Sequence, residues 1–173
     1  VIRPGIVHRI DMDTTGVIIA CKNDMAHSSI AAQLKEHSIT RRYQPLYMAL
    51  LRRMRGLWTL PLAAIGGAQE NEHQLPERQE CSNPLQVLNR FRQYTHVECR
   101  LETGRTHQIR VHMASIRHPL LGDAVYGPAR CPISGLCGQT LHAGILGSFT
   151  PGPENIWNFQ RPCRITLRNS FAP

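Results

Sequence analysis

The sequence has no long apolar run, no C-x-x-C pair and almost no lysine. No stretch of its 173 residues is long and apolar enough for a transmembrane helix, and no signal peptide is recognisable. The composition, 42% hydrophobic and 18% charged, is typical of a globular protein of about one domain. These absences argue against a membrane-spanning or secreted protein, and we expect a cytoplasmic one.

The six cysteines are scattered, and their spacing matches no zinc signature. Cys21 and Cys99 fall inside apolar strand patterns, so we expect buried free thiols in a reducing compartment. Cys131 and Cys137 flank a Pro/Gly loop and could form a bridge or bind a metal.

Lysine occurs only at positions 22 and 35, so nearly all of the cations are arginines. The net charge is +8 and the pI is about 9.7. Arginine presents a planar fork of donors that suits phosphates and bases. A basic, arginine-rich domain therefore indicates a nucleic-acid partner first, and an anionic membrane surface only second.

Hydrophobic periodicity predicts both helices and strands. A helix is expected from Met25 to His37 after the N-cap Asn23-Asp24, and a second one from Thr106 to about Ile116. Alternation predicts a half-buried strand over residues 96–101, with Val97, Cys99 and Leu101 on one face. Apolar runs indicate further strands over residues 17–21 and 141–147, and a recognisable pattern returns at residues 87–91.

Residues 44–86 show little pattern. Leu46–Leu51 could be a strand or a short helix, and residues 68–84 are polar with two prolines. The chain also begins abruptly at Val1, directly before a motif-like stretch, so we expect a fragment that begins within a domain.

Three features have both a structural and a functional interpretation when each is taken alone. Asp11 or Asp13 could cap a turn or serve a loop-borne active site. Tyr43 could pack inward from a strand or stack on a base. The start of the second helix, with Arg105 and Arg110, is a possible anion site, whereas His107 and His112 have no third metal ligand near them.

Four segments, in order, resemble the signatures of one family. They are His8-Arg9-Ile10-Asp11 with Thr15-Gly16, Gly104-Arg105-Thr106-His107-Gln108-Ile109-Arg110-Val111-His112, His118-Pro119-Leu120-Leu121-Gly122-Asp123 with Tyr126-Gly127, and Leu141-His142-Ala143. Arg41-x-Tyr43 lies where the family has K-x-Y. On these motifs the sequence resembles the RluA/RluD-type RNA pseudouridine synthases over residues 5–43 and 87–147.

The resemblance implies an α+β pseudouridine synthase fold in a single catalytic domain over residues 1–173. A mixed, mostly antiparallel central sheet would be flanked by helices and loops, with the active site in a basic cleft. The implied activity is isomerisation of specific uridines in structured RNA to pseudouridine, with ribosomal RNA first and transfer RNA second. No metal or organic cofactor is implied, and we expect a monomer.

The resemblance also implies roles for individual residues. Asp11 would be the essential carboxylate, acting as a nucleophile or as a base on the C2′ proton, and Arg110 would pair with it and keep it ionised. Tyr43 would stack on the uracil and remove the C5 proton. The predicted RNA-binding residues are Arg9, Arg41, Arg42, Arg105 and His107. Of these, Arg105 and His107 could instead buttress the site.

Residues 44–86 and 150–173 depart from the family pattern, and the strands that precede His8 in the family are absent. We therefore hypothesise that residues 44 to about 86, and again about 150–173, are translated out of frame. Ordered strands at 44–86 would count against this hypothesis. The alternatives to an enzyme are a non-catalytic basic RNA-binding domain, or inactive remnant, and, more weakly, a metal-binding domain.

Overall fold

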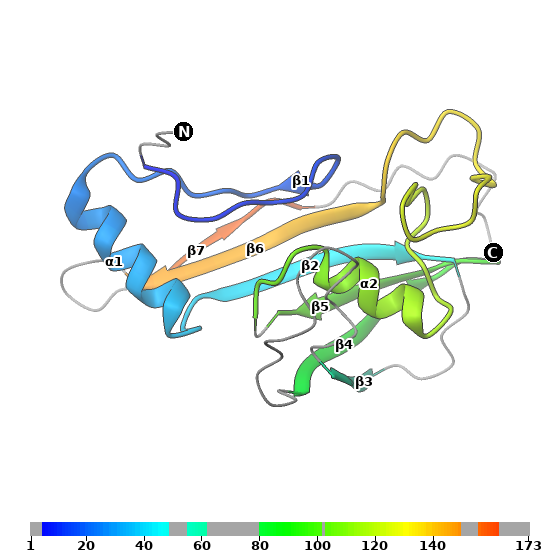
Figure 1. Cartoon of the computed structure of the whole chain (residues 1–173), viewed down its shortest axis with the longest axis horizontal. Coiled ribbons are helices and arrows are strands. Elements are labelled where there is room, and N and C mark those ends of the chain that lie inside the picture. Colours follow the sequence, from blue (N-terminus) through cyan, green and yellow to red (C-terminus); the bar gives the residue numbers. More distant parts are fainter. Residues whose placement is uncertain (1–4, 49–54, 62–79, 102, 150–155, 163–173) are drawn as a thin grey trace, which may run out of the picture.

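The computed structural model describes residues 5–48, 55–61, 80–101, 103–149 and 156–162, which form one sheet and two helices (Figure 1). In chain order the elements are β1 (Thr15–Gly16), α1 (Asp24–Lys35), β2 (Thr40–Tyr47), β3 (Arg55–Pro61), β4 (Glu80–Arg90), β5 (Thr95–Arg100), α2 (Gln108–Ser115), β6 (Leu141–Phe149) and β7 (Ile156–Gln160).

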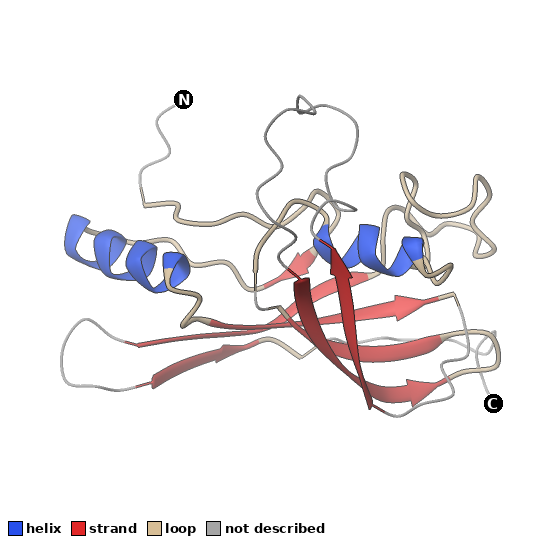
Figure 2. Ribbon diagram, turned by 60° about the horizontal axis from the view of Figure 1, so that its bottom comes forward, coloured by secondary structure: helices blue, strands red, loops and turns tan. Residues whose placement is uncertain are grey.

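Within the described residues the strands form one sheet in the order β1-β6-β2-β5-β4-β3, with β7 also paired to β6. The pairs are antiparallel except for β1, which runs parallel to β6. Both helices lie on the same side of this sheet (Figure 2). The mixed, mostly antiparallel α+β architecture expected from the sequence is thus confirmed.

The main core lies between the sheet and α2. The alternating residues of β5, Val97 and Cys99, are buried against Ile109 and Met113 of α2. Burial of these apolar faces is the principal force that holds α2 on the sheet. The alternation predicted for residues 96–101 is therefore confirmed, and so is the buried thiol of Cys99, which is free.

Helix α1 begins where the sequence predicted. The Asn23 side chain accepts a hydrogen bond from the Ala26 amide at 2.8 Å, as an N-cap does. Ile30 is buried, and Leu34 packs in the same cluster. The helix ends at Lys35 and does not reach His37, because His37 takes a left-handed conformation with φ +56°.

The strand expected over residues 17–21 was wrong. Only Thr15 and Gly16 pair with β6, and β7 occupies the same edge of β6 from Ile145 onward. The chain therefore leaves the sheet after Val17, and its apolar residues pack beside α1. Cys21 is half-buried there, not buried as expected.

Strands also occupy parts of residues 44–86 that showed no pattern in the sequence. β2 continues to Tyr47, and Arg55–Pro61 pairs in antiparallel register with residues 80–86. In this segment the sequence indicated only a strand or short helix at Leu46–Leu51, and the ordered strands count against an out-of-frame origin of β3 and β4. Residues 49–54 and 62–79 lie outside the described residues. In the second suspect segment, 150–173, the structure describes residues 156–162, including β7.

Candidate active site

A cavity of about 470 Å³ opens between the loop that carries Asp11, strand β2 and the start of α2. Among the residues that the structure describes, Asp11 is the one acidic residue that lines it. The basic residues lining it are Arg9, Arg41, Arg105, Arg110, His8, His37 and His107. The basic cleft expected from the sequence is therefore present, and Asp11 supplies a carboxylate to it.

The loop that carries Asp11 is held by hydrogen bonds on both sides of that residue. Upstream, the Nε2 atom of His8 accepts from the Ile19 amide at 2.9 Å. Burial, and then the charge of Arg41, lower the pKa of His8 below its usual 6.5, which favours the neutral ring needed for this acceptor role. The hydrogen bond accepted by the neutral His8 ring thus helps to fix the loop.

Downstream of Asp11 the chain makes a tight turn. The Thr14 amide donates to the Asp11 carbonyl at 3.0 Å, and Asp13 has φ +67°. The buried Gln139 side chain donates to the Met12 carbonyl and, at 3.2 Å, to the Thr14 hydroxyl. Asp11 therefore stands on a rigid loop and lines the cleft, whereas Asp13 is exposed and does not line it.

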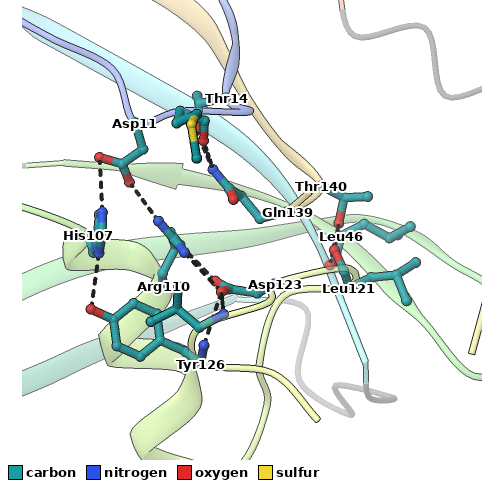
Figure 3. A network of polar contacts seen from close by, with 12 residues as sticks. Asp11, Thr14, Leu46, His107, Arg110, Leu121, Asp123, Tyr126, Gln139 and Thr140 are labelled. Carbon is teal, nitrogen blue, oxygen red and sulfur yellow. Dashed lines mark hydrogen bonds and ion pairs between the residues drawn. The ribbon is translucent and has the colours of Figure 1, made fainter. Parts of the chain in front are cut away.

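Two basic groups face the two oxygens of Asp11 (Figure 3). Arg110 Nη1 lies 3.6 Å from Oδ2, and His107 Nε2 lies 3.8 Å from Oδ1. The Asp11 side chain is 15% exposed, so the charge of Arg110 acts on it in a partly desolvated setting. The predicted ion pair between Arg110 and Asp11 is present, and His107 buttresses the same carboxylate.

Arg110 makes its strongest contacts with a second carboxylate, Asp123. Nε donates to Oδ2 at 2.7 Å and Nη2 donates to Oδ1 at 2.9 Å, in a bidentate pair that is almost fully buried. The Asp123 carboxylate also accepts from the Val125 and Tyr126 amides, each at 3.0 Å. This fork leaves Nη1 of Arg110 pointing at Asp11.

Burial alone would raise the pKa of Asp123, but the hydrogen bonds from Arg110 and the two backbone amides lower it below 3.8 overall. The same hydrogen bonds from Arg110 raise the pKa of its guanidinium against the opposing effect of burial. Both groups are therefore charged at neutral pH, which fixes Arg110 as a cation beside Asp11.

Tyr126 completes the network. Its ring lies 5.2 Å from the Arg110 guanidinium carbon, and its hydroxyl lies 3.0 Å from Nδ1 of His107. No role was predicted for Asp123 or Tyr126, although both lie in the segment His118–Gly127 that matched the family. That match was the one signal available to find them.

Helix α2 starts later in the sequence than expected. It begins at Gln108 after an N-cap at His107, not at Thr106, and His107 has φ +54° with no side-chain capping bond. The preceding loop is tied down by the Gln108 side chain, which accepts from the Thr103 hydroxyl and the Arg105 amide. The left-handed turn directs the His107 ring toward Asp11.

Strand β2 contributes Arg41 and Tyr43 to the cleft. Burial raises the pKa of Tyr43 above 10, with opposite contributions from Arg41, which lowers it, and Asp11, which raises it. Tyr43 is therefore a neutral phenol at physiological pH. A Cβ atom on Gly104 would overlap the Arg41 guanidinium, so glycine permits the close approach of these two segments.

The remaining predicted RNA-binding residues divide between the cleft and the surface. Arg9 and Arg105 are exposed and line the cleft. Arg42 does not line it, and its Nη1 pairs with Glu98 on β5 at 2.9 Å. The structure thus brings Arg9, Arg41 and Arg105 together but not Arg42.

The described part of the chain offers neither a metal cluster nor a membrane-spanning helix. No group of three or more His, Cys, Asp or Glu side chains there is arranged to hold a metal ion. Neither helix in that part has the length and apolar character required to cross a bilayer.

The fold and the cleft define a class of protein, in which a mixed sheet supports a basic cleft around one carboxylate held by a guanidinium and an imidazole. Residues 1–115 match the family described as RNA pseudouridylate synthase, and the chain belongs to this family.

Individual relatives agree with this membership. The chain is 43% identical over 165 residues to a Bacillus subtilis protein described as an uncharacterised RNA pseudouridine synthase, YlyB, covering 94% of the chain and 53% of that relative. It is 40% identical over 159 residues to the ribosomal large subunit pseudouridine synthase D of Zymomonas mobilis, covering 87% and 50%. The chain spans about half the length of the curated relatives it matches.

Solved structures give the same fold. The human RNA pseudouridylate synthase domain containing 1 superposes with a TM-score of 0.74 at 25% identity, covering 91% of this chain and 68% of that one. The human RNA pseudouridylate synthase domain containing 4 superposes with a TM-score of 0.66 over 82% of this chain and 66% of that one; at 20% identity it shows the fold alone.

Proposed function

We propose that this chain carries the catalytic domain of an RNA pseudouridine synthase that uses Asp11 as its essential carboxylate. The observation that supports this most directly is the placement of Asp11, on a rigid loop in a basic cleft, between Arg110 at 3.6 Å and His107 at 3.8 Å. The reaction requires an ionised carboxylate, and the Arg110 cation faces it.

In the reaction the N1–C1′ bond of a uridine breaks, the base turns, and a C5–C1′ bond forms. C5 loses its proton and N1 gains one, so the product is an isomer of the substrate. Asp11 attacks a carbon covalently or removes the C2′ proton, and both routes begin from the ionised carboxylate. Tyr43, a neutral phenol in the cleft, would stack on the uracil and take part in removal of the C5 proton.

A uridine must leave its helical stack to reach a carboxylate inside a cleft. Arg9 and Arg105, exposed along the cleft, and Arg41 on β2 would hold the phosphates of the extruded nucleotide. Arg42 would contact RNA only outside the cleft, where it competes with its pairing to Glu98.

For the substrate we propose ribosomal RNA first, with transfer RNA as the second possibility. Relatives from Zymomonas mobilis and Pseudomonas aeruginosa are named ribosomal large subunit pseudouridine synthase D. An enzyme of ribosomal RNA would work in the cytoplasm, and we propose that it does so as a monomer.

The test compares two neighbouring carboxylates. Asp11→Asn removes the charge in the cleft, and the matched control Asp13→Asn removes an exposed charge two residues away, with asparagine chosen because it tolerates the left-handed backbone at position 13. We expect tritium release from C5-tritiated uridine in ribosomal RNA to be lost in Asp11→Asn and kept in Asp13→Asn.

RNA binding, measured by filter retention, should persist in both variants because the arginines of the cleft remain. Equal release from Asp11→Asn and the wild type would refute the catalytic assignment. Binding without any release from the wild-type chain would support the alternative, a non-catalytic RNA-binding domain.

A further inference from the structure

The side chains of Tyr126, His107 and Asp11 are joined in sequence by polar contacts (Figure 3). The Tyr126 hydroxyl lies 3.0 Å from Nδ1 of His107, and Nε2 of the same ring lies 3.8 Å from Oδ1 of Asp11. The Tyr126 and His107 rings meet edge to face, with centroids 5.6 Å apart. One imidazole therefore faces a phenol on one side and a carboxylate on the other.

The chemistry of these three groups determines where the ring proton lies. An ionised carboxylate only accepts hydrogen bonds, so the nitrogen that faces Asp11 is stabilised when it carries the proton. In the neutral ring the other nitrogen, Nδ1, then has a free lone pair, which accepts the Tyr126 O–H. In the opposite tautomer a lone pair on Nε2 would face the negative carboxylate.

We propose that Tyr126 is a positioning residue for the reaction: its hydroxyl donates to His107 Nδ1, keeps the ring proton on Nε2 and thereby directs a donor at the Asp11 carboxylate. This inference rests on the proposed function, because it gives a role in catalysis to two residues around the proposed catalytic Asp11. Tyr126 and His107 form the second of two arms that hold Asp11, since Arg110 faces the other carboxylate oxygen.

Both arms are anchored by the short loop that carries Asp123 and Tyr126. Asp123 receives Arg110 in a bidentate pair and also accepts from the Tyr126 amide, so one carboxylate places the guanidinium and the phenol together. The His107 backbone is fixed in turn, because its carbonyl accepts from the Val111 amide at 2.9 Å in the first turn of α2. The phenol and the imidazole therefore meet in one geometry.

The distances agree with a positioning role. The two contacts on Asp11, at 3.6 and 3.8 Å, are longer than hydrogen bonds, so its oxygens stay available to a substrate atom. Asp123 differs, because its oxygens accept four hydrogen bonds of 2.7 to 3.0 Å and are fully engaged. Asp11 is oriented by two charged or polar neighbours without being occupied by them.

The first experiment reads the tautomer directly, by ¹⁵N correlation spectroscopy of the histidine rings at about pH 8.5, where histidines are ordinarily neutral. The His107 signals are assigned by their loss in His107→Asn, since asparagine suits the left-handed backbone there. We expect a protonated Nε2 in the wild type and a shift toward the Nδ1-protonated form in Tyr126→Phe. A wild-type ring protonated on Nδ1, or no change in Tyr126→Phe, would overturn the proposal.

The second experiment measures kinetics with tritium release. Tyr126→Phe keeps the ring beside Arg110 and the backbone bond to Asp123, and loses only the hydroxyl. We expect kcat to fall by about fivefold to tenfold, the effect of one neutral hydrogen bond, with KM within about twofold of the wild type. The double variant with His107→Asn should be no slower than His107→Asn alone, because Tyr126 acts through that ring.

Tyr47→Phe is the matched control. Tyr47 is a fully buried tyrosine whose hydroxyl lies 3.4 Å from Cys99 Sγ, and it does not line the cleft. It should leave kcat and the His107 tautomer unchanged. An unchanged kcat in Tyr126→Phe, or an equal fall in Tyr47→Phe, would contradict the positioning role. Absence of release from the wild type would refute the proposed function and, with it, the catalytic role of Tyr126. The ring spectra would still decide whether the Tyr126 hydroxyl sets the His107 tautomer.

Discussion

Replacing Asp123 by asparagine tests whether a buried carboxylate aims Arg110 at Asp11. The variant keeps the size of the side chain, and its amide oxygen can still accept from the Val125 and Tyr126 amides. The amide nitrogen then replaces Oδ2, which accepts from Arg110 Nε at 2.7 Å in the native protein. Two donors would face each other, and the negative charge beside a buried guanidinium would be gone.

The expected cost follows from the burial of the pair. The Asp123 side chain is 0% exposed and that of Arg110 is 6% exposed. Loss of one partner from a buried pair costs about 3–5 kcal/mol. We expect about 3 kcal/mol for Asp123→Asn, the lower end, because Arg110 keeps Asp11 as a second anion at 3.6 Å. With an m value of about 2 kcal/mol/M, the urea midpoint would fall by about 1.5 M.

The pKa of Asp123 sets the pH range in which this difference is seen. Because the folded-state pKa is below 3.8, the stabilisation is complete above that value and is lost as the pH falls through the folded-state pKa. The gap in urea midpoint between the wild type and Asp123→Asn should therefore be full at pH 7 and should narrow in acid below about pH 4.

Glu98→Gln is the matched control, because Glu98 pairs with Arg42 at a similar distance, 2.9 Å, near the surface. That pair should contribute only about 0–1 kcal/mol. Tritium release should fall in Asp123→Asn, because Arg110 is no longer held with Nη1 toward Asp11. It should persist in Glu98→Gln. If the two variants lose equal stability, or if Asp123→Asn keeps full kcat, the buried pair does not hold the site.

Two further predictions concern Tyr43 and His8. Tyr43→Phe keeps the stacking ring and loses the hydroxyl, so tritium release should fall by about 10²–10⁴ in kcat with RNA binding unchanged, and full activity would exclude the phenol from proton transfer. His8 has a lowered pKa and accepts from the Ile19 amide, so its stabilisation is complete above pH 6.5 and is lost as the pH falls through its folded-state pKa. Hydrogen exchange at Ile19 should accelerate over that range, and exchange that is independent of pH after correction for the intrinsic rate would contradict this.

Much of the site could be predicted because its residues lie in compact motifs. Asp11, Tyr43 and Arg110 come from three separate segments, and the structure places all three on one cleft. The alternation of β5 and the N-cap of α1 were also visible, because both depend on neighbours within a few residues.

Other contacts depend on residues that are far apart and leave no local pattern. The pairing of Asp123 with Arg110, and the contact of Tyr126 with His107, depend on how the loop after α2 folds back on that helix. Strand β3 was not foreseen because its pairing partner, β4, lies beyond residues 62–79.

By itself the sequence determined the family, the basic character of the chain and the carboxylate that we propose as essential, since motifs and charge are carried by residue identity. Only the tertiary structure decided how that carboxylate is held. The edge of β6 is shared between β1 and β7, which turns residues 17–21 out of the sheet and packs them beside α1. Such competition for one set of backbone hydrogen bonds is settled between distant strands, and no local pattern records its outcome.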